Sequence, residues 1–332
     1  MSAVQRKRPE HWATAAPDVP AVVAGDRELT YRDWDQLAEA LTGFQPVHQR
    51  VCVCLHQCPE WFTVNLALAK LQWEHIAISW RLTSAEQLRL IEACGAGILI
   101  TDNAGAGELA RARPSPQLRV VRVGDSGPDV IPFASLLGGP LAPPWWSKRP
   151  APFVKYTSGT TGEPKGVRRP TAASEQQRQR RLESDRGPLE RMRAAMADGS
   201  DFHHRALLTL PMHHGIGPRG ARACHNEGGT CYLLDRYDPE HALRLISRHR
   251  ITHWTTVPTM LQRMRSLPTE TLASFDVSSM RMLAVGSAPV PPCRSRNGPW
   301  VTSSAPWTAG SRVMSRQHSR PCTVACRPAR LS

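Results

Sequence analysis

The sequence predicts an α/β fold with doubly wound, mostly parallel sheets. Short apolar runs alternate with helical segments from about residue 50 to residue 290, and this alternation favours parallel pairing of the strands. The chain has 332 residues, of which 41% are hydrophobic, so it can bury a sizeable core.

The first alternation predicts three strands joined by two helices. Pro59 opens the first helix, which runs over Glu60–Leu71, in a first-turn position where its missing N–H costs no hydrogen bond. Thr83–Glu86 forms a capping box that begins the second helix. The predicted strands are Arg50–Leu55, His75–Ser79 and Gly97–Thr101.

The second alternation follows a Pro- and Gly-containing segment at 103–150. A polar stretch at 171–200 predicts a solvated helix. Asp238 is a predicted N-cap because Pro239 follows it in the first helical position. The predicted strands are Phe153–Thr157, Arg205–Leu210, Thr230–Leu234, Ile251–Val257 and Met280–Val285.

The net charge of +14 is unevenly spread along the chain. Residues 277–332 contain eight Arg and no Lys, Asp or Glu. Only 6% of residues are aromatic, whereas a single-strand nucleic-acid groove interleaves aromatic and basic side chains, so we expect no nucleic-acid partner. No apolar run has the roughly 20 residues of a transmembrane helix, and the nine cysteines lack regular spacing, so we expect a cytoplasmic protein with reduced thiols.

The strongest chemical signal is the segment at 156–167. A predicted strand runs into a loop with glycines, hydroxyl side chains and one lysine, which together suit the phosphates of a nucleotide. It is not the P-loop NTPase pattern, because Glu163 and Pro164 interrupt it. The candidate phosphate-binding residues are Thr157, Ser158, Gly159, Thr160, Thr161, Gly162 and Lys165.

This segment resembles the phosphate-loop signature of the AMP-forming acyl-CoA synthetases, members of the adenylate-forming superfamily. The resemblance covers roughly residues 10–292. Leu29–Asp33 is similar to the opening strand and helix start of that family, and Cys58–Trp61 to its first helix. Ile78–Thr83 is similar to a variant found in fatty-acid-type ligases.

The resemblance also implies roles for residues further along the chain. Leu210–Gly215 is similar to a Pro–x–aromatic–His–x–x–Gly segment, in which His214 takes the histidine position and His213 replaces the aromatic residue. The resemblance makes His214 and Lys165 the candidate catalytic residues. Thr255–Met260 is similar to the wall of the acyl channel, although ordinary packing explains it equally well. The candidate adenine-binding residues are Gly286, Ser287, Ala288 and Pro289.

By this resemblance the expected reaction uses ATP, Mg²⁺ and coenzyme A. The expected substrate is a carboxylic acid, either a fatty acid or another lipid acid, which is activated as its adenylate and then joined to the thiol of coenzyme A. No Glu follows Glu270 and no Asp follows Asp276, so no magnesium ligand is predicted.

The prediction for the end of the chain differs from the family pattern. We expect 1–292 to be an incomplete large N-terminal domain, 293–332 to be an out-of-frame or disordered tail, and the small C-terminal domain to be absent. Two alternatives stay open: a non-catalytic fragment or pseudogene product that binds nucleotide or acyl group, and, more weakly, a nucleic-acid binder that uses the Arg-rich tail. The oligomeric state is not predicted.

Overall fold

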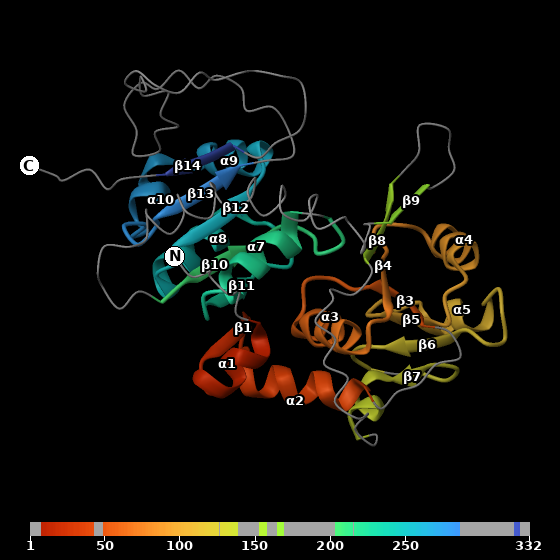
Figure 1. The fold of residues 1–332 in the computed structure, drawn as a ribbon. Helices are drawn as coiled ribbons and strands as arrows, with labels where there is room; N and C mark the ends of the chain where they lie inside the picture. Colours follow the sequence, from red (N-terminus) through yellow and green to blue (C-terminus); the bar gives the residue numbers. More distant parts are fainter. Residues whose placement is uncertain are drawn as a thin grey trace, which may run out of the picture.

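The computed structural model describes residues 8–42, 49–125, 127–138, 153–157, 165–168, 203–214, 216–285 and 322–325. These residues form two sheets with helices between them and on their outer faces (Figure 1). Sheet A has seven strands in the order β14-β13-β12-β10-β11-β1-β2, and sheet B has seven in the order β7-β6-β5-β3-β4-β8-β9. Most neighbouring strands are parallel, so the predicted α/β, doubly wound fold is confirmed.

Sheet B is built from the first alternation. Its strands are β3 (Arg50–Cys54), β4 (Glu74–Ala77), β5 (Ile98–Thr101), β6 (Arg119–Arg122), β7 (Ile131–Pro132), β8 (Phe153–Thr157) and β9 (Lys165–Arg168). Its helices are α3 (Pro59–Leu71), α4 (Ser84–Cys94), α5 (Ala106–Arg111) and the 3₁₀ helix η1 (Phe133–Gly138). Only β9 runs antiparallel to its neighbour, β8.

Local sequence signals explain where these helices begin and end. The predicted capping box is confirmed at α4: the Glu86 N–H donates to Thr83 Oγ1 at 3.3 Å, and the Thr83 N–H donates to the Glu86 carboxylate at 2.8 Å. Helix α4 ends at Gly95, whose φ of 61° lies in the left-handed region that glycine adopts without strain. Pro59 opens α3 as predicted.

Sheet A combines the N-terminal strands with the second alternation. Its strands are β1 (Pro20–Ala24), β2 (Arg27–Thr30), β10 (Arg205–Leu208), β11 (Thr230–Leu233), β12 (His253–Thr256), β13 (Met282–Val285) and β14 (Cys322–Ala325). Its helices are α1 (Pro9–Ala15), α2 (Tyr31–Thr42), α7 (Ile216–His225), α8 (Pro239–His249), α9 (Pro258–Arg265) and α10 (Thr269–Ala273). The predicted N-cap of α8 is confirmed, since Asp238 Oδ1 accepts from the His241 N–H at 2.7 Å.

Strand β14 differs from what the sequence predicts. The pattern in 293–332 indicates no strand, yet Cys322–Ala325 pairs antiparallel with β13. Backbone hydrogen bonds hold this pair whatever the side-chain pattern, and Thr323 and Val324 are β-branched residues that suit a strand. This pairing covers the edge of β13 that does not face β12. The division between 1–292 and 293–332 stays a prediction.

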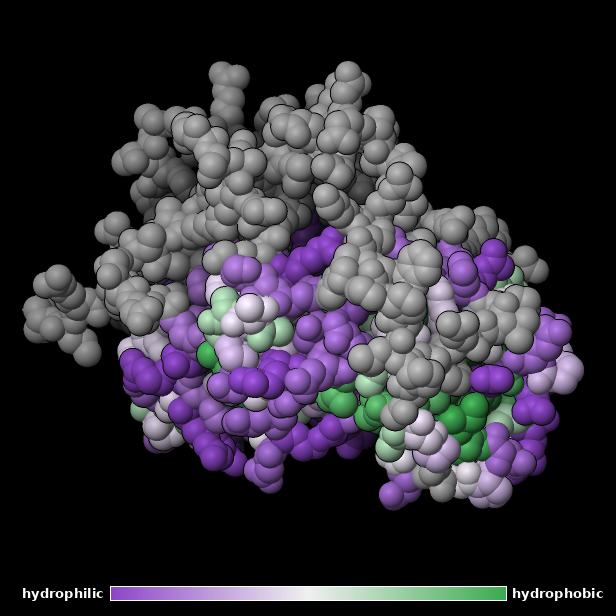
Figure 2. Space-filling model, turned by 60° about the horizontal axis from the view of Figure 1, so that its bottom comes forward, coloured by the Kyte–Doolittle hydropathy of each residue, from purple (hydrophilic) through white to green (hydrophobic). Residues whose placement is uncertain are grey.

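The largest core cluster lies between the two sheets. It joins Val22 and Leu208 of sheet A to Val51 of sheet B, together with buried side chains of α2, α3 and α7. Separate clusters lie under α8 and α9 on the outer face of sheet A, and under α4 and α5 on the outer face of sheet B. Figure 2 shows a largely hydrophilic surface on the side of sheet A and a hydrophobic region on the side of sheet B. The shared cluster fixes the orientation of one sheet relative to the other.

Candidate functional site

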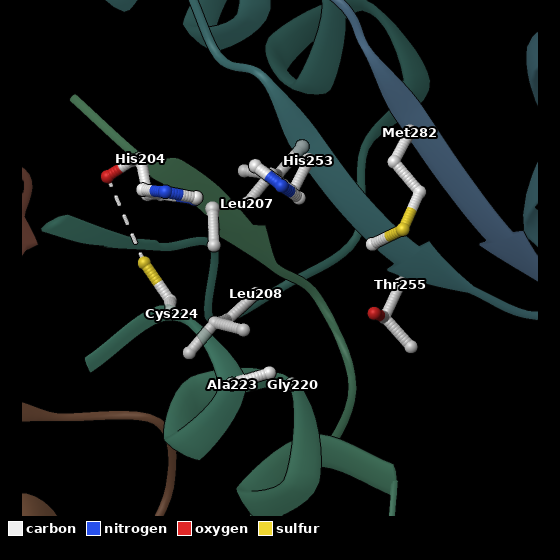
Figure 3. Close-up of a pocket in the computed structure, with 10 residues that line it drawn as sticks. His204, Leu207, Leu208, Gly220, Ala223, Cys224, His253, Thr255 and Met282 are labelled. Carbon is white, nitrogen blue, oxygen red and sulfur yellow. Dashed lines mark hydrogen bonds between the residues drawn. The ribbon is translucent and has the colours of Figure 1, made fainter. Parts of the chain in front are cut away.

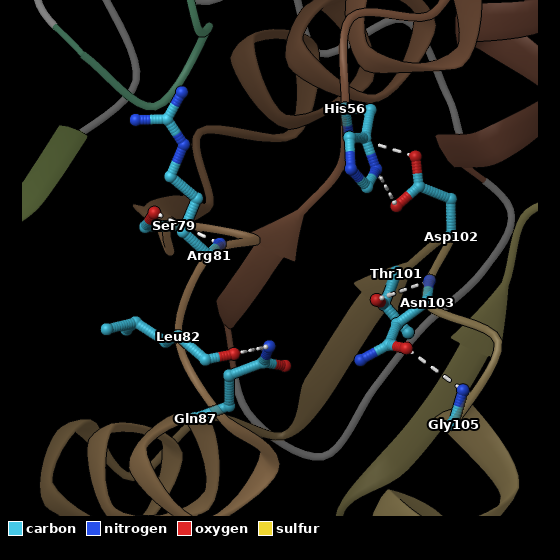
Figure 4. Close-up of polar contacts among 9 residues, drawn as sticks. All are labelled: His56, Ser79, Arg81, Leu82, Gln87, Thr101, Asp102, Asn103 and Gly105. Carbon is cyan, nitrogen blue, oxygen red and sulfur yellow. Dashed lines mark hydrogen bonds and ion pairs between the residues drawn. The ribbon is translucent and has the colours of Figure 1, made fainter.

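Three ionisable side chains of sheet B lie just after the carboxyl ends of its parallel strands. His56 comes two residues after β3, Arg81 four residues after β4, and Asp102 directly after β5 (Figure 4). Ligands of open parallel sheets bind at this edge, because the strand ends bring separate loops together there.

His56 and Asp102 form a defined pair. The His56 N–H donates to Asp102 Oδ2 at 2.9 Å, and His56 Nδ1 lies 3.0 Å from Asp102 Oδ1. The Trp80 ring lies 4.3 Å from the His56 ring, and the Arg81 guanidinium lies 4.9 Å from the Trp80 ring. The carboxylate and the indole therefore hold the imidazole in one orientation, with Nδ1 toward Asp102.

The predicted phosphate loop leaves from the same edge. Strand β8 runs parallel to β4, and the antiparallel register of β8 and β9 pairs Thr157 directly with Lys165. The segment 158–164 therefore begins and ends at neighbouring backbone positions. The candidates Ser158, Gly159, Thr160, Thr161 and Gly162 lie outside the described residues, as do the side chains of Thr157 and Lys165. Their roles stay predictions.

The histidine motif lies at the corresponding edge of sheet A. The His214 N–H donates to the Pro211 carbonyl at 3.1 Å, which tightens the turn after β10, and the His214 side chain is exposed. The His213 side chain is half-buried, and within the described part of the chain neither of its ring nitrogens has a hydrogen-bond partner. The role of His214 stays a prediction, while His213 is the more enclosed of the two rings.

The surroundings of His213 keep its imidazole neutral. Burial lowers its pKa to about 3, and the positive charge of the Arg81 guanidinium acts in the same direction. Arg81 and His56 belong to sheet B, whereas His213 belongs to sheet A. His213 is therefore a neutral imidazole at the junction of the two edges.

The predicted adenine-binding loop follows β13 of sheet A in the sequence. Gly286, Ser287, Ala288 and Pro289 lie outside the described residues, directly after the end of β13. Since β13 is parallel to β12, and β12 to β10, this loop begins at the same edge as the turn that carries His213.

A cavity lies between α7 and the inner face of sheet A (Figure 3). The space inside it is small, about 30 Å³, which suits a group no larger than a water molecule. Residues of β10, β12 and β13 form one wall, and small residues of α7 form the other. The lining residues include Leu208, Gly220, Ala223, Cys224, Thr255 and Met282, with His204 and His253 beside them.

The described residues do not provide a metal site. Within the ranges given above, no group of three or more His, Cys, Asp or Glu side chains could hold a metal ion. The Mg²⁺ that the resemblance implies therefore stays a prediction, and we derive no step through it. Over the same ranges, no helix has the length and apolar character needed to cross a membrane.

The His56–Asp102 pair, the position of Arg81 and the cavity are not predicted from the sequence. One available signal could have found the pair, because each of its residues follows a buried strand of the first alternation. The cavity has no comparable signal, since its walls come from four separate elements.

The two sheets, with their mostly parallel strands and the helices between and outside them, define a doubly wound α/β protein. The chain belongs to the AMP-binding enzyme family, whose model matches residues 9–296.

Its curated relatives include several coenzyme A ligases. A propanoyl:CoA ligase of Mycobacterium tuberculosis, named for a methyl-dioxo-octahydro-inden ring, is 29% identical over 296 residues, which are 83% of this chain and 55% of the relative. The indoleacetate–CoA ligase of Aromatoleum aromaticum is 27% identical over 293 residues, or 83% of this chain and 53% of the relative. The chain thus spans about half the length of these relatives.

The solved structures support the same fold. The N-terminal domain of FACL13 from Mycobacterium tuberculosis has a TM-score of 0.65 at 23% identity, over 86% of this chain and 70% of that domain. A fatty acyl CoA synthetase of the same organism has a TM-score of 0.64 at 22% identity, over 85% of this chain and 54% of that one.

Proposed function

We propose that this protein activates a carboxylic acid with ATP and transfers the acyl group to coenzyme A. Family membership and the coenzyme A ligases among its relatives support the proposal. The observation that carries it is the match of the AMP-binding enzyme family model to residues 9–296, a range that includes the predicted phosphate loop.

The proposed chemistry has two steps. A carboxylate oxygen attacks the α-phosphorus of ATP, the bond from that phosphorus to the bridging oxygen breaks, and pyrophosphate leaves. The thiol sulfur of coenzyme A then attacks the acyl carbon and loses its proton to the solvent, and AMP leaves with the electron pair of the broken acyl–oxygen bond.

Each part of the site has a role in this proposal. Lys165 and the 157–162 loop hold the β- and γ-phosphates, so their positive charge and N–H groups stabilise the departing pyrophosphate. His214 lies beside the carboxylate, and 286–289 frames the adenine. A neutral His213 can donate a hydrogen bond to the carboxylate without forming an ion pair that would weaken it as a nucleophile.

A second candidate is nucleotide binding without acyl transfer. The two candidates differ in whether bound ATP releases pyrophosphate.

The experiment combines calorimetric titration with ATP and an ATP–pyrophosphate exchange assay over a panel of carboxylic acids. The ligase proposal requires exchange that depends on the added carboxylic acid. Lys165→Ala is expected to abolish this exchange and to lower the affinity for ATP at least tenfold. Arg265→Ala is the control, because it also removes one positive charge but lies exposed on α9. ATP binding without exchange would leave only the second candidate, and no ATP binding would exclude both.

The location and partner of the chain belong to the same proposal. A cytoplasmic location is supported by the cysteines whose side chains the structure describes, all of which are free. The partner is a carboxylic acid, and the relatives named above act on acids that carry ring systems.

A further inference from the structure

Two cysteine side chains meet on the outer face of sheet B. Cys52 lies in the middle of β3, and Cys94 is the last residue of α4, which packs on that face. Their sulfur atoms lie 3.5 Å apart, and both thiols are free. Cys94 precedes β5, so the pair lies away from the carboxyl ends of the strands, where the candidate site is.

The contacts of Arg50 fix this approach. The Arg50 carbonyl accepts from the Gly97 N–H at 3.1 Å, and Arg50 Nη1 donates to the Cys94 carbonyl at 3.1 Å. Arg50 is two residues before Cys52 on β3, so these contacts tie the end of α4 to the same strand. Gly95 ends the helix directly after Cys94. The fold therefore holds the two thiols in contact.

The hydrogen bonds of the pair set the direction of its S–H groups. Cys94 Sγ donates to the Ile91 carbonyl at 3.3 Å, so the Cys52 thiol is the donor in the contact between the two sulfurs. When Cys94 loses its proton, the Cys52 thiol still donates to the thiolate. The Ile91 carbonyl then keeps the Ala96 N–H as its donor, at 3.3 Å. Ionisation of Cys94 therefore leaves none of these groups unsatisfied.

The two thiols differ in how readily they ionise. The hydrogen bond from Cys52 lowers the pKa of Cys94, burial opposes this shift, and the positive Arg50 guanidinium supports it. Burial raises the pKa of Cys52. Cys94 is therefore the nucleophile of the pair, because the thiolate is the form of cysteine that reacts with oxidants.

Cys94 also lies closer to solvent than Cys52. Cys52 is fully buried, whereas Cys94 keeps 8% of its surface exposed. The residues on either side of Cys94 in the chain, Ala93 and Gly95, are exposed. The oxidant that suits this position is therefore small and uncharged, such as hydrogen peroxide.

We propose that Cys94 and Cys52 form a redox-active pair, which a hydroperoxide converts to a disulfide and a dithiol reductant restores. The Cys94 thiolate attacks one peroxide oxygen, the O–O bond breaks, and the leaving hydroxide takes up a proton to become water. The Cys52 sulfur then attacks the Cys94 sulfur, the S–O bond of the sulfenic acid breaks, and the oxygen leaves as water with the Cys52 proton. The two sulfurs lose two electrons in total, and the peroxide gains them.

Closing the disulfide requires only a short movement. A disulfide bond is about 2.05 Å long, so the two sulfurs must approach by about 1.5 Å from their separation of 3.5 Å. Small rotations about the two Cα–Cβ bonds produce a shift of this size. The bond joins the middle of β3 to the end of α4 across 42 residues of sequence. In the cytoplasmic location proposed above, such a disulfide is transient and responds to oxidants.

The test treats the reduced full chain with hydrogen peroxide, blocks the remaining thiols with N-ethylmaleimide and maps the disulfides by peptide mass spectrometry. The expected result is one dominant bridge, Cys52–Cys94, at least tenfold more abundant than any other cysteine pair. Dithiothreitol is expected to remove it. Absence of this bridge, or a random mixture of bridges among the nine cysteines, would overturn the proposal.

Three variants separate the roles of the two thiols. In Cys52→Ala the sulfenic acid of Cys94 has no partner, so dimedone, which reacts with sulfenic acids, is expected to label Cys94 at least tenfold more than in the parent chain. In Cys94→Ala dimedone is expected to leave Cys52 unlabelled, because Cys52 is fully buried. Cys54→Ala, also buried in β3, is the control and is expected to keep the bridge.

The remaining outcomes decide the proposal as follows. Labelling of Cys52 in place of Cys94 would overturn the assignment of Cys94 as the nucleophile. Loss of the bridge in Cys54→Ala would overturn the pairing. The mapping in the parent chain needs no variant, so it decides the proposal even where a substitution prevents folding, and it does not depend on ligase activity.

Discussion

His225 is expected to make folding sensitive to acid. Its ring lies in the core between the sheets, 4.7 Å from the Trp34 ring and 5.6 Å from the Phe62 ring. Its Nε2 lies 2.9 Å from the Ala21 carbonyl, to which it donates when protonated at that nitrogen. Burial lowers the pKa of His225 to about 4, a shift that the hydrogen bond to Ala21 opposes.

The sign of the effect follows from proton binding. Below pH 6.5 the unfolded chain takes up a proton at this histidine, whereas the folded chain does not until about pH 4. The contribution of the neutral His225 ring to the free energy of unfolding is complete at pH 7. It is lost as the pH falls from about 6.5 to about 4, at about 1.4 kcal/mol per pH unit. At pH 5, about 1.5 units below the unfolded pKa, the loss is about 2 kcal/mol.

The assay is urea unfolding at pH 7 and pH 5, followed by tryptophan fluorescence. His225→Gln keeps a side-chain N–H but cannot titrate, so its free energy of unfolding should fall by about 2 kcal/mol less between the two pH values than that of the parent chain. His241→Gln is the control, because His241 is exposed at the start of α8. Equal losses in the parent chain and in His225→Gln would refute the reasoning.

Three further substitutions test local features by urea or thermal unfolding. Thr83→Ala removes the capping box of α4 and should cost about 1 kcal/mol, whereas Thr14→Ala, exposed in α1, should cost less. Gly229→Ala would bring a Cβ to 2.5 Å from the His204 carbonyl oxygen and should lower the free energy of unfolding by about 1–3 kcal/mol. Gly127→Ala is its control, because a Cβ there would meet nothing within 4 Å. Equal costs of the two substitutions would contradict the close packing at Gly229. Asp102→Ala leaves the backbone N–H of His56 without its acceptor and should lower the free energy of unfolding by about 1–3 kcal/mol. An unchanged unfolding midpoint would show that the His56–Asp102 pair adds no stability.

The elements with strong local signals were predictable from the sequence. β8 has the predicted bounds Phe153–Thr157, and the caps at Thr83 and Asp238 lie where the sequence predicts them. These signals act over a few residues, so a single sequence is enough to show them. β14 was not predicted, because its partner β13 and the backbone pairing that holds it are distant in sequence.

The candidate site was predictable only in part. The motif that contains Thr157 and Lys165 is contiguous, so the sequence alone indicates its chemistry. His56 and Asp102 are 46 residues apart, and their pairing depends on the parallel register of β3 and β5. His213 and His214 are adjacent in sequence but differ in burial, a difference that no local pattern encodes.

The position of β1 has a consequence for the order of events during synthesis. β1 pairs with β11, and the Thr230 hydroxyl donates to the Pro20 carbonyl across 210 residues of sequence. All of sheet B is encoded between these two strands, so on the ribosome it can form while β1 still lacks its neighbour. Closing so long a loop is slow, and the β1–β2 hairpin meanwhile exposes an unpaired edge to other nascent chains. Pairing of β1 with β11 is therefore expected to be a late step, and a chaperone that shields that edge would raise the yield of folded protein.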